Sequence, residues 1–167
     1  MQPATLRVAA DPLGGARAHL AGSRQSSNVS AMTLRVLGLD HVVLRVRNLD
    51  GALGFYRDAL GCEIERRIDA LGLVQLRAGS SLIDLVPVDS PLGKAGGGAP
   101  AVDGKNVDHI CLRIASFDAD ALAAHLRSHG IEPGEVGTRF GAEGSGPSMY
   151  VRDPDGNVVE LKGPASA

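Results

Sequence analysis

Hydrophobic and polar residues follow the same order in two halves of the chain. The segment over residues 39–46, LDHVVLRV, returns over residues 107–114 as VDHICLRI, with a histidine at the third position of each copy. In the first copy Val42, Leu44 and Val46 fall on alternate positions, which is the period of a β-strand with one buried face. The pattern therefore predicts two modules of the same fold, each beginning with a strand.

The first module continues with a helix and three short strands. Leu53, Tyr56 and Leu60 recur at helical spacing, Asp50 is the expected N-cap, and Gly61 is placed to end the helix in the left-handed conformation. Apolar runs bounded by turn residues then predict strands over 62–67, 73–77 and 82–88. The predicted order of elements is βαβββ.

The second module repeats this order. Asp118 is the expected N-cap of its helix, Leu126 is one of its inward-facing residues, and Gly130 is placed to end it. The last two strands are predicted over 149–152 and 157–162, on either side of an Asp-Pro-Asp-Gly turn. The second βαβββ unit is then complete.

A glycine-rich stretch over residues 132–148 interrupts the periodicity of the second module. It predicts a loop with a short strand around Val136. Its glycines, from Gly134 to Gly146, do not follow a strand and open a helix, so a phosphate-binding loop is poorly supported. We expect a mobile lid instead.

These elements predict one α+β domain over residues 34–165. A βαβββ unit leaves one sheet face uncovered by its helix, so two units side by side would form a curved eight-stranded mixed sheet around a metal-binding cavity. Residues 1–33 are rich in Ala, Gly and Ser without a sustained apolar period, and we expect a disordered or processed extension there. Within the domain the expected parts are module one (34–88), a linker (89–106) and module two (107–165).

Composition narrows the partners and the compartment. The formal net charge of -2 provides no basic surface for nucleic acid, and no apolar run approaches the roughly 18 residues needed to cross a bilayer. Cys62 and Cys111 stand without CxxC spacing or a secretory signal, which favours a reducing compartment. We expect a cytoplasmic protein with a small-molecule substrate and neither nucleic acid nor membrane as partner. Organellar targeting by residues 1–31 is the weaker alternative.

Each module carries one histidine and one carboxylate at matching places. His41 and Asp84 lie in the first and last predicted strands of module one, and His109 and Glu160 take the same places in module two. A carboxylate inside an apolar strand costs free energy unless a positive group meets it. Two imidazoles and one or two carboxylates suit Zn, Ni, Mn, Co or Fe(II), with positions left for substrate. We therefore predict a metal site of His41, His109, Glu160 and Asp84. Whether Asp84 reaches the metal is left open, because its side chain is shorter than that of glutamate.

Other polar residues have weaker claims to a role. Arg45 and Arg113 share strand faces with the two histidines, about 13 Å further along by strand rise. They would either hold an anionic end of the substrate or lie at the rim in water. Cys111 is expected to be a small buried residue, and His125 and His129 have the i, i+4 spacing of a surface helix face.

On these residues the chain resembles the vicinal oxygen chelate superfamily, which includes glyoxalase I, methylmalonyl-CoA epimerase, fosfomycin-resistance thiol transferases, extradiol dioxygenases and bleomycin-resistance proteins. The resemblance covers about residues 34–163. It rests on LDHVVL (39–44), FYRDALG (55–61), VDH (107–109) and YVRDPDGNVVE (150–160).

The resemblance implies that His41, His109 and Glu160 hold a divalent metal; at the position of Asp84, glyoxalase- and epimerase-type members usually carry Glu or Gln. The substrate would chelate the ion through two neighbouring oxygens, and the ion would stabilise the enolate or alkoxide. Glu160 first, and Asp84 second, would remove the proton next to a carbonyl. Family members are commonly homodimers whose modules pair across subunits, so the four positions could come from two chains.

The expected activity is that of a metal-dependent lyase or isomerase of the lactoylglutathione lyase type. One alternative is an extradiol-type Fe(II) dioxygenase, for which His41, His109 and Glu160 would suffice. The other is a non-catalytic protein that binds a small molecule or drug, as bleomycin-resistance proteins do.

Overall fold

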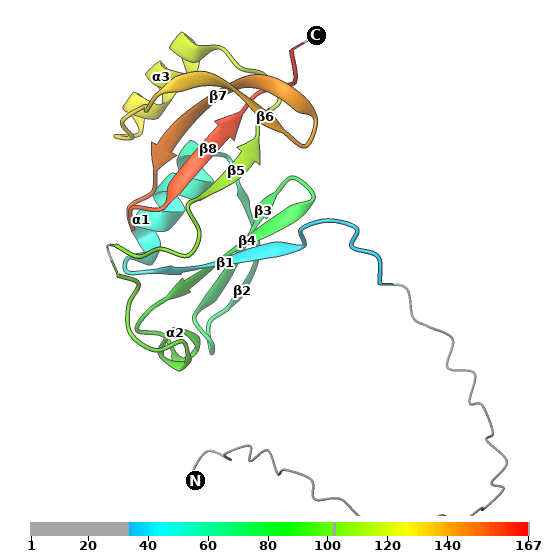
Figure 1. Cartoon of the computed structure of the whole chain (residues 1–167). Helices are drawn as coiled ribbons and strands as arrows, with labels where there is room; N and C mark the ends of the chain where they lie inside the picture. The colour runs from blue at the N-terminus through cyan, green and yellow to red at the C-terminus, as the bar shows by residue number, and fades with distance from the viewer. Residues whose placement is uncertain (1–33, 102, 167) are drawn as a thin grey trace, which may run out of the picture. The chain divides into compact units, whose positions relative to one another are not determined.

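The computed structural model describes residues 34–101 and 103–166 (Figure 1). The extension predicted for residues 1–33 lies outside the described residues. One compact unit begins at Leu37 and holds both predicted modules. In the described part of the chain no helix has the length and apolar character needed to span a membrane.

Module one forms a four-stranded sheet in the order β1-β4-β3-β2, with β1 parallel to β4 and the other pairs antiparallel. The three strands predicted after the helix are confirmed within a residue or two at each end. The elements are β1 (His41–Val46), α1 (Leu49–Leu53), the π-helical η1 (Gly54–Ala59), β2 (Glu63–Ile68), β3 (Leu73–Ala78) and β4 (Ser81–Pro87).

The helix of module one begins differently from the prediction. Asn48, not Asp50, is the N-cap, because its backbone is extended and its side chain accepts a hydrogen bond from the backbone N–H of Gly51 at 3.0 Å. Asp50 lies in the first turn, where a carboxylate interacts favourably with the helix dipole. The chain leaves the helix through Gly61, whose φ of 73° confirms the predicted left-handed end.

Module two repeats the topology as a sheet in the order β5-β8-β7-β6. The predicted N-cap Asp118 is confirmed by its hydrogen bond from the backbone N–H of Ala121, and Gly130 ends the helix with φ at 73°. The elements are β5 (His109–Arg113), α3 (Ala119–Ser128), β6 (Val136–Gly141), β7 (Gly144–Arg152) and β8 (Val158–Lys162).

The expectation of a mobile loop over residues 132–148 is wrong for most of that stretch. Strands β6 and β7 form an antiparallel hairpin that extends from the pair Val136 and Met149 to Gly141 and Gly144. Its glycines allow close approach: a Cβ on Gly146 would collide with the backbone of Pro164. The segment predicted as the linker contains the short helix α2 (Pro91–Ala95).

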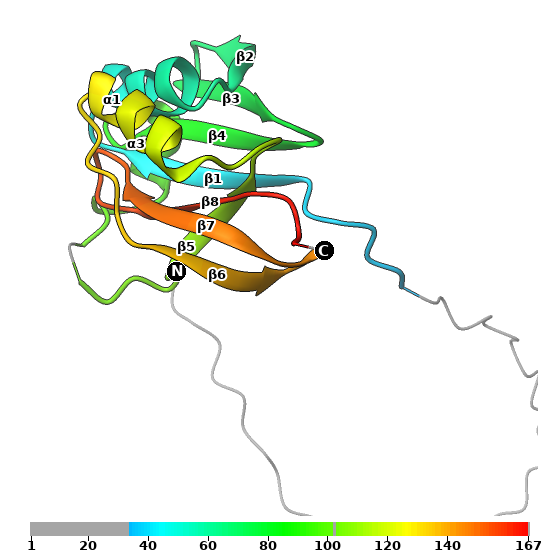
Figure 2. The ribbon, with the colours of Figure 1, turned by 90° about the horizontal axis from the view of Figure 1, so that it is seen from above.

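The two modules keep separate sheets and share a core. In the described residues β1 and β5 each pair on one side only, so the predicted eight-stranded sheet is divided into two four-stranded ones. Buried residues of both modules form one hydrophobic cluster, which includes Tyr56, Leu85 and Leu161. Figure 2 shows α1 beside α3. In the same region the Nε2 atom of His125 lies 2.8 Å from the carbonyl oxygen of Ala59 at the end of η1.

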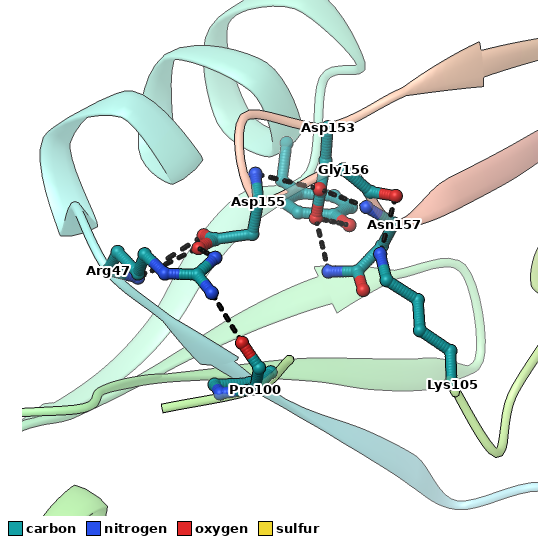
Figure 3. A network of polar contacts seen from close by, with 8 residues as sticks. Arg47, Pro100, Lys105, Asp153, Asp155, Gly156 and Asn157 are labelled. Atoms are coloured by element: carbon teal, nitrogen blue, oxygen red, sulfur yellow. Dashed lines mark hydrogen bonds and ion pairs between the residues drawn. The ribbon is translucent and has the colours of Figure 1, made fainter. Parts of the chain in front are cut away.

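A buried carboxylate ties the modules together in the turn between β7 and β8 (Figure 3). Asp153 Oδ1 accepts from the backbone N–H groups of Asp155 and Asn157, and Oδ2 accepts from the hydroxyl of Tyr56 at 2.9 Å. Burial raises the pKa of Tyr56 well above its ordinary range, so its hydroxyl stays a donor. Asp155 in turn accepts from the backbone N–H of Arg47 at 3.0 Å. The turn of module two is thereby fixed to the helix and first strand of module one.

Substitution Tyr56→Phe is expected to lower the free energy of unfolding by about 1–2 kcal/mol, because it removes a donor to a buried carboxylate and leaves the packing intact. The measurement is urea denaturation of the full chain at fixed protein concentration. The matched control is Ser128→Ala, which removes a hydroxyl from the exposed side of α3 and should cost less than about 0.5 kcal/mol. Equal stability of the two variants would contradict the tie between the modules.

Candidate metal centre

His41 and Asp84 form the first pair of predicted ligands. Strand β1 runs parallel to β4 with Val43 opposite Asp84, so His41, two residues before Val43, lies on the same sheet face as Asp84. The carboxylate of Asp84 is buried, and both of its oxygens accept from Nε2 of Gln75 at 3.1 and 3.0 Å. Gln75 is therefore a neighbour of the site that the sequence did not reveal.

His109 and Glu160 form the second pair. The Nε2 atom of His109 lies 3.3 Å from Oε2 of Glu160, whose side chain is 7% exposed. The other oxygen of Glu160, Oε1, is buried without a hydrogen-bond partner among the described residues. A buried carboxylate oxygen with no partner is costly, so this pair is incomplete as it stands.

Each histidine is oriented by the aspartate that precedes it. Asp40 Oδ1 lies 2.7 Å from Nδ1 of His41, and Asp108 Oδ2 lies 2.8 Å from Nδ1 of His109. The hydrogen bond that His41 donates to Asp40, assisted by the charge of Asp84, raises the pKa of His41. In metal sites a carboxylate at one ring nitrogen fixes the tautomer and increases the basicity of the other nitrogen. Nε2 of His41 is thus available for a ligand, and Nε2 of His109 faces the carboxylate of Glu160.

The described residues of one chain do not bring the two pairs together. In residues 34–101 and 103–166 no group of three or more His, Cys, Asp and Glu side chains is arranged to hold a metal ion. The pair His41 and Asp84 belongs to β1 and β4, and the pair His109 and Glu160 to β5 and β8. The four residues predicted as metal ligands therefore lie in two separate pairs, which we call half-sites, and metal binding by them stays a prediction.

The residues of the second half-site fit a divalent ion better than those of the first. An ion at Nε2 of His109 and at Glu160 would supply the charge that the unpartnered Oε1 lacks. Asp84 already has the amide of Gln75 on both oxygens, so it would have to share its carboxylate with the ion.

A family model for the Glyoxalase/Bleomycin resistance protein/Dioxygenase superfamily matches residues 38–161. The chain belongs to this superfamily. A glyoxalase domain-containing protein of Mycosarcoma maydis is 35% identical over 129 residues, which cover 77% of this chain and 69% of the relative. The suspected membership in the vicinal oxygen chelate superfamily is thereby confirmed.

Solved structures support the glyoxalase fold. An integron cassette protein from the mobile metagenome of V. cholerae has a TM-score of 0.59 at 25% identity and covers 79% of this chain and 98% of its own. A lactoylglutathione lyase from Agrobacterium tumefaciens has a TM-score of 0.54 at 24% identity, with coverages of 77% and 94%. These likenesses agree with the prediction of tandem βαβββ modules.

Within this glyoxalase domain, Arg45 has a structural task that the sequence did not show. Its Nη1 atom donates to the carbonyl oxygen of Gly96 at 3.0 Å, and its Nη2 atom donates to those of Gly93 and Gly97. A guanidinium at the last carbonyls of a helix satisfies groups that have no partner inside it. Arg45 thus caps α2, and its predicted contact with substrate stays a prediction.

Arg113 is paired with Glu143, and both side chains are more than half exposed. Its neighbour on β5, Cys111, lies opposite Glu160 in the register. Burial, followed by the negative charge of Glu160, raises the pKa of the Cys111 thiol to about 11. The thiol is therefore protonated at neutral pH. Both cysteines of the chain are free. Cys62 is buried, but Cys111 is exposed as a residue, so the expectation that Cys111 is buried is wrong.

Several polar residues around the second half-site were not predicted. Arg139 lies over the ring of Tyr150, with Cζ 4.2 Å from the ring centroid, and the ring of Tyr150 meets that of His109 edge to face at 5.5 Å. The register of β7 on β8 explains the placement, because Tyr150 lies opposite Glu160 and Ser148 opposite Lys162. Alternation along β7 was the signal in the sequence, but it is visible only once the hairpin is recognised.

A cavity of about 750 Å³ opens between the modules. His109, Cys111 and Arg113 line it from β5, and Ser81 and Leu82 line it from β4. A cleft of about 850 Å³ elsewhere is lined by α1, η1 and the turn after β7, and contains neither half-site. The smaller of these two cavities thus reaches one predicted metal ligand, His109.

The raised pKa predicts slow alkylation of Cys111 in the folded protein, because only the thiolate reacts. Iodoacetamide labelling of the metal-free chain, mapped by mass spectrometry, should show a midpoint near pH 11 at Cys111, against an ordinary value of 9.0 in the urea-unfolded control. A midpoint below that of the unfolded control would mean that a positive group, and not burial with Glu160, determines the pKa of this thiol.

Proposed function

We propose that this protein is a divalent-metal-dependent enzyme of the lactoylglutathione lyase type, acting on a small substrate that offers two neighbouring oxygens to the metal. In this proposal His41 and Asp84 of one copy meet His109 and Glu160 of a second copy to form each site of a homodimer. The superfamily membership supports the general activity, and the half-sites support the sharing between copies.

The observation that carries the proposal is the unpartnered Oε1 atom of buried Glu160, 7% exposed, beside an imidazole nitrogen. Nothing in the apolar strand Val158–Lys162 requires a carboxylate there, and isolation of its charge costs free energy. A metal ion at His109 and Glu160 removes that cost. The matching pair in module one supplies the remaining ligands in the manner typical of an open catalytic site.

Unpaired strand edges next to the half-sites support a second copy as the partner. β1 and β5 each have one unpaired side among the described residues, and an exposed strand edge readily pairs with another chain. The large apolar side chains of Leu39, Val43 and Val107 are 72%, 49% and 57% exposed close to His41 and His109. A symmetric interface would bury these side chains twice and bring the pairs of ligands together.

The chemistry follows from what surrounds each carboxylate. The bound metal would polarise the chelating oxygens of the substrate and stabilise negative charge on them. Glu160 has one oxygen free of hydrogen bonds and is the better base for a proton next to a carbonyl. Asp84 is held by Gln75 on both oxygens and is the weaker candidate.

The first test is metal binding by the full chain, loaded separately with Zn, Ni and Fe(II) and measured after dialysis. His109→Ala and Glu160→Gln should each lower the affinity at least about tenfold, since even groups that only orient a ligand contribute that much. Matched controls are His129→Ala and Glu132→Gln, which change exposed residues outside both half-sites. Full-strength binding by the first two variants would contradict the proposed ligands.

The second test is the reaction of the loaded protein. Isomerisation of the hemithioacetal of methylglyoxal and glutathione, lowered about 100-fold or more in Glu160→Gln, is the expected result for a general base. Ring cleavage of catechol by the iron-loaded protein in air would show that the protein is a dioxygenase and that the isomerase proposal is wrong. Absence of metal binding in the unmodified protein would contradict both enzyme proposals and favour a non-catalytic protein that binds a small molecule.

A further inference from the structure

We propose that Arg139 is the residue that selects the substrate, by holding a carboxylate arm beside the His109 and Glu160 half-site. The inference rests on the proposed function for the metal end of the substrate. Its own basis is the arrangement of positively charged side chains on the same face of the second sheet.

Arg139 is fixed in place before any ligand arrives. Its Nη1 atom donates to the hydroxyl oxygen of Ser148 at 2.9 Å, and Ser148 is fully buried. The guanidinium also lies over the ring of Tyr150 at 4.2 Å. Gly137 leaves room for it, because a Cβ there would lie 3.2 Å from Nη1. A guanidinium held this way loses little rotamer freedom on binding and presents a fork that matches a carboxylate.

The guanidinium of Arg139 is connected to the half-site of His109 and Glu160 through the ring of Tyr150. The ring of Tyr150 contacts Arg139 on its face and His109 edge to face, at a centroid distance of 5.5 Å from the imidazole. On the neighbouring strand, Glu160 and Lys162 are two residues apart on the same face, about 7 Å by strand rise. Arg139 and His109 thus lie against the same tyrosine ring, a separation that a small substrate can span.

Neither cation of this region, Arg139 or Lys162, forms an ion pair with a buried carboxylate among the described residues. Lys162 is 4% exposed, and both acceptors of its ammonium group among the described residues are backbone carbonyl oxygens, those of Arg139 and Gly146. The carboxylate paired with Arg139, that of Glu135, is 82% exposed and 3.8 Å away. Such a pair contributes little in water. Two neighbouring cations whose charge is so weakly neutralised by carboxylates favour an anionic ligand.

The other arginines expected to bind an anion are already engaged. Arg45 caps α2 through both Nη atoms, and Arg113 is paired with Glu143 at the exposed end of its strand. Arg139 is 21% exposed, so it is both accessible to a small molecule and shielded from bulk water. The substrate class that fits is a short acid with two chelating oxygens at one end and a carboxylate at the other.

The test compares two hydroxamates that chelate metal through the same two oxygens. Acetohydroxamate lacks an acidic arm, whereas succinomonohydroxamate carries a carboxylate. With the metal-loaded full chain, calorimetry should show at least tenfold tighter binding of the acid. In Arg139→Gln this preference should fall to about twofold or less while acetohydroxamate affinity stays within twofold. Arg139→Lys should retain part of the preference, and Arg127→Gln, an exposed arginine of α3, should retain all of it.

A second measurement does not depend on the metal. Titration of the metal-free chain with sodium succinate, at constant ionic strength set by chloride, should produce a saturable shift of the Arg139 Nε–H signal in NMR spectra, identified by its loss in Arg139→Gln. If this shift appears but no hydroxamate binds, the metal site fails and the anion subsite stands. An unchanged preference in Arg139→Gln, or the absence of a saturable shift with succinate, overturns the assignment of Arg139. Equal shifts with succinate and with inorganic phosphate would mean that the site recognises anionic charge without selecting a carboxylate, and would overturn the substrate class.

Discussion

The geometry of the second half-site depends on one buried carboxylate, that of Asp153. It accepts four hydrogen bonds, two from backbone N–H groups of its own turn, one from the side chain of Asn157 and one from the hydroxyl of Tyr56. Four donors compensate the burial of a negative charge that would otherwise be prohibitive. Because the turn leads directly into β8, this network sets the register that places Glu160 opposite Tyr150. Through Tyr56 it also holds the two modules in one unit.

Two buried carboxylates of similar appearance therefore have different roles. Asp153 is saturated with donors and contributes to the fold, whereas Glu160 has an oxygen with no partner in the described chain. Asp84 is intermediate between these cases. Its two oxygens accept hydrogen bonds from the amide of Gln75 alone, which leaves further acceptor positions unused. The difference in hydrogen bonding identifies Glu160 as the carboxylate with a free acceptor atom, a distinction that the positions of acidic residues in the sequence do not make.

The order of elements was predictable because each is specified by local residues. Alternating apolar positions identified the strands, and Gly61 and Gly130 marked the helix ends through a left-handed conformation that other residues avoid. The β6–β7 hairpin is not predictable in the same way, because a glycine-rich sequence is typical of a loop, whereas these glycines allow close packing against the C-terminal segment. The cap provided by Arg45 and the position of Arg139 depend on contacts between distant segments, which no local pattern encodes.

The central claim is that two copies of the chain complete each metal site, and subunit mixing tests it directly. One variant combines His41→Ala with Asp84→Asn, and the other combines His109→Ala with Glu160→Gln, so neither alone retains a complete set of ligands. Refolded together in equal amounts, they should regain about a quarter of the native metal sites, because half of the dimers are mixed and each mixed dimer has one intact site. A mixture that binds no more metal than the separate variants would contradict the account.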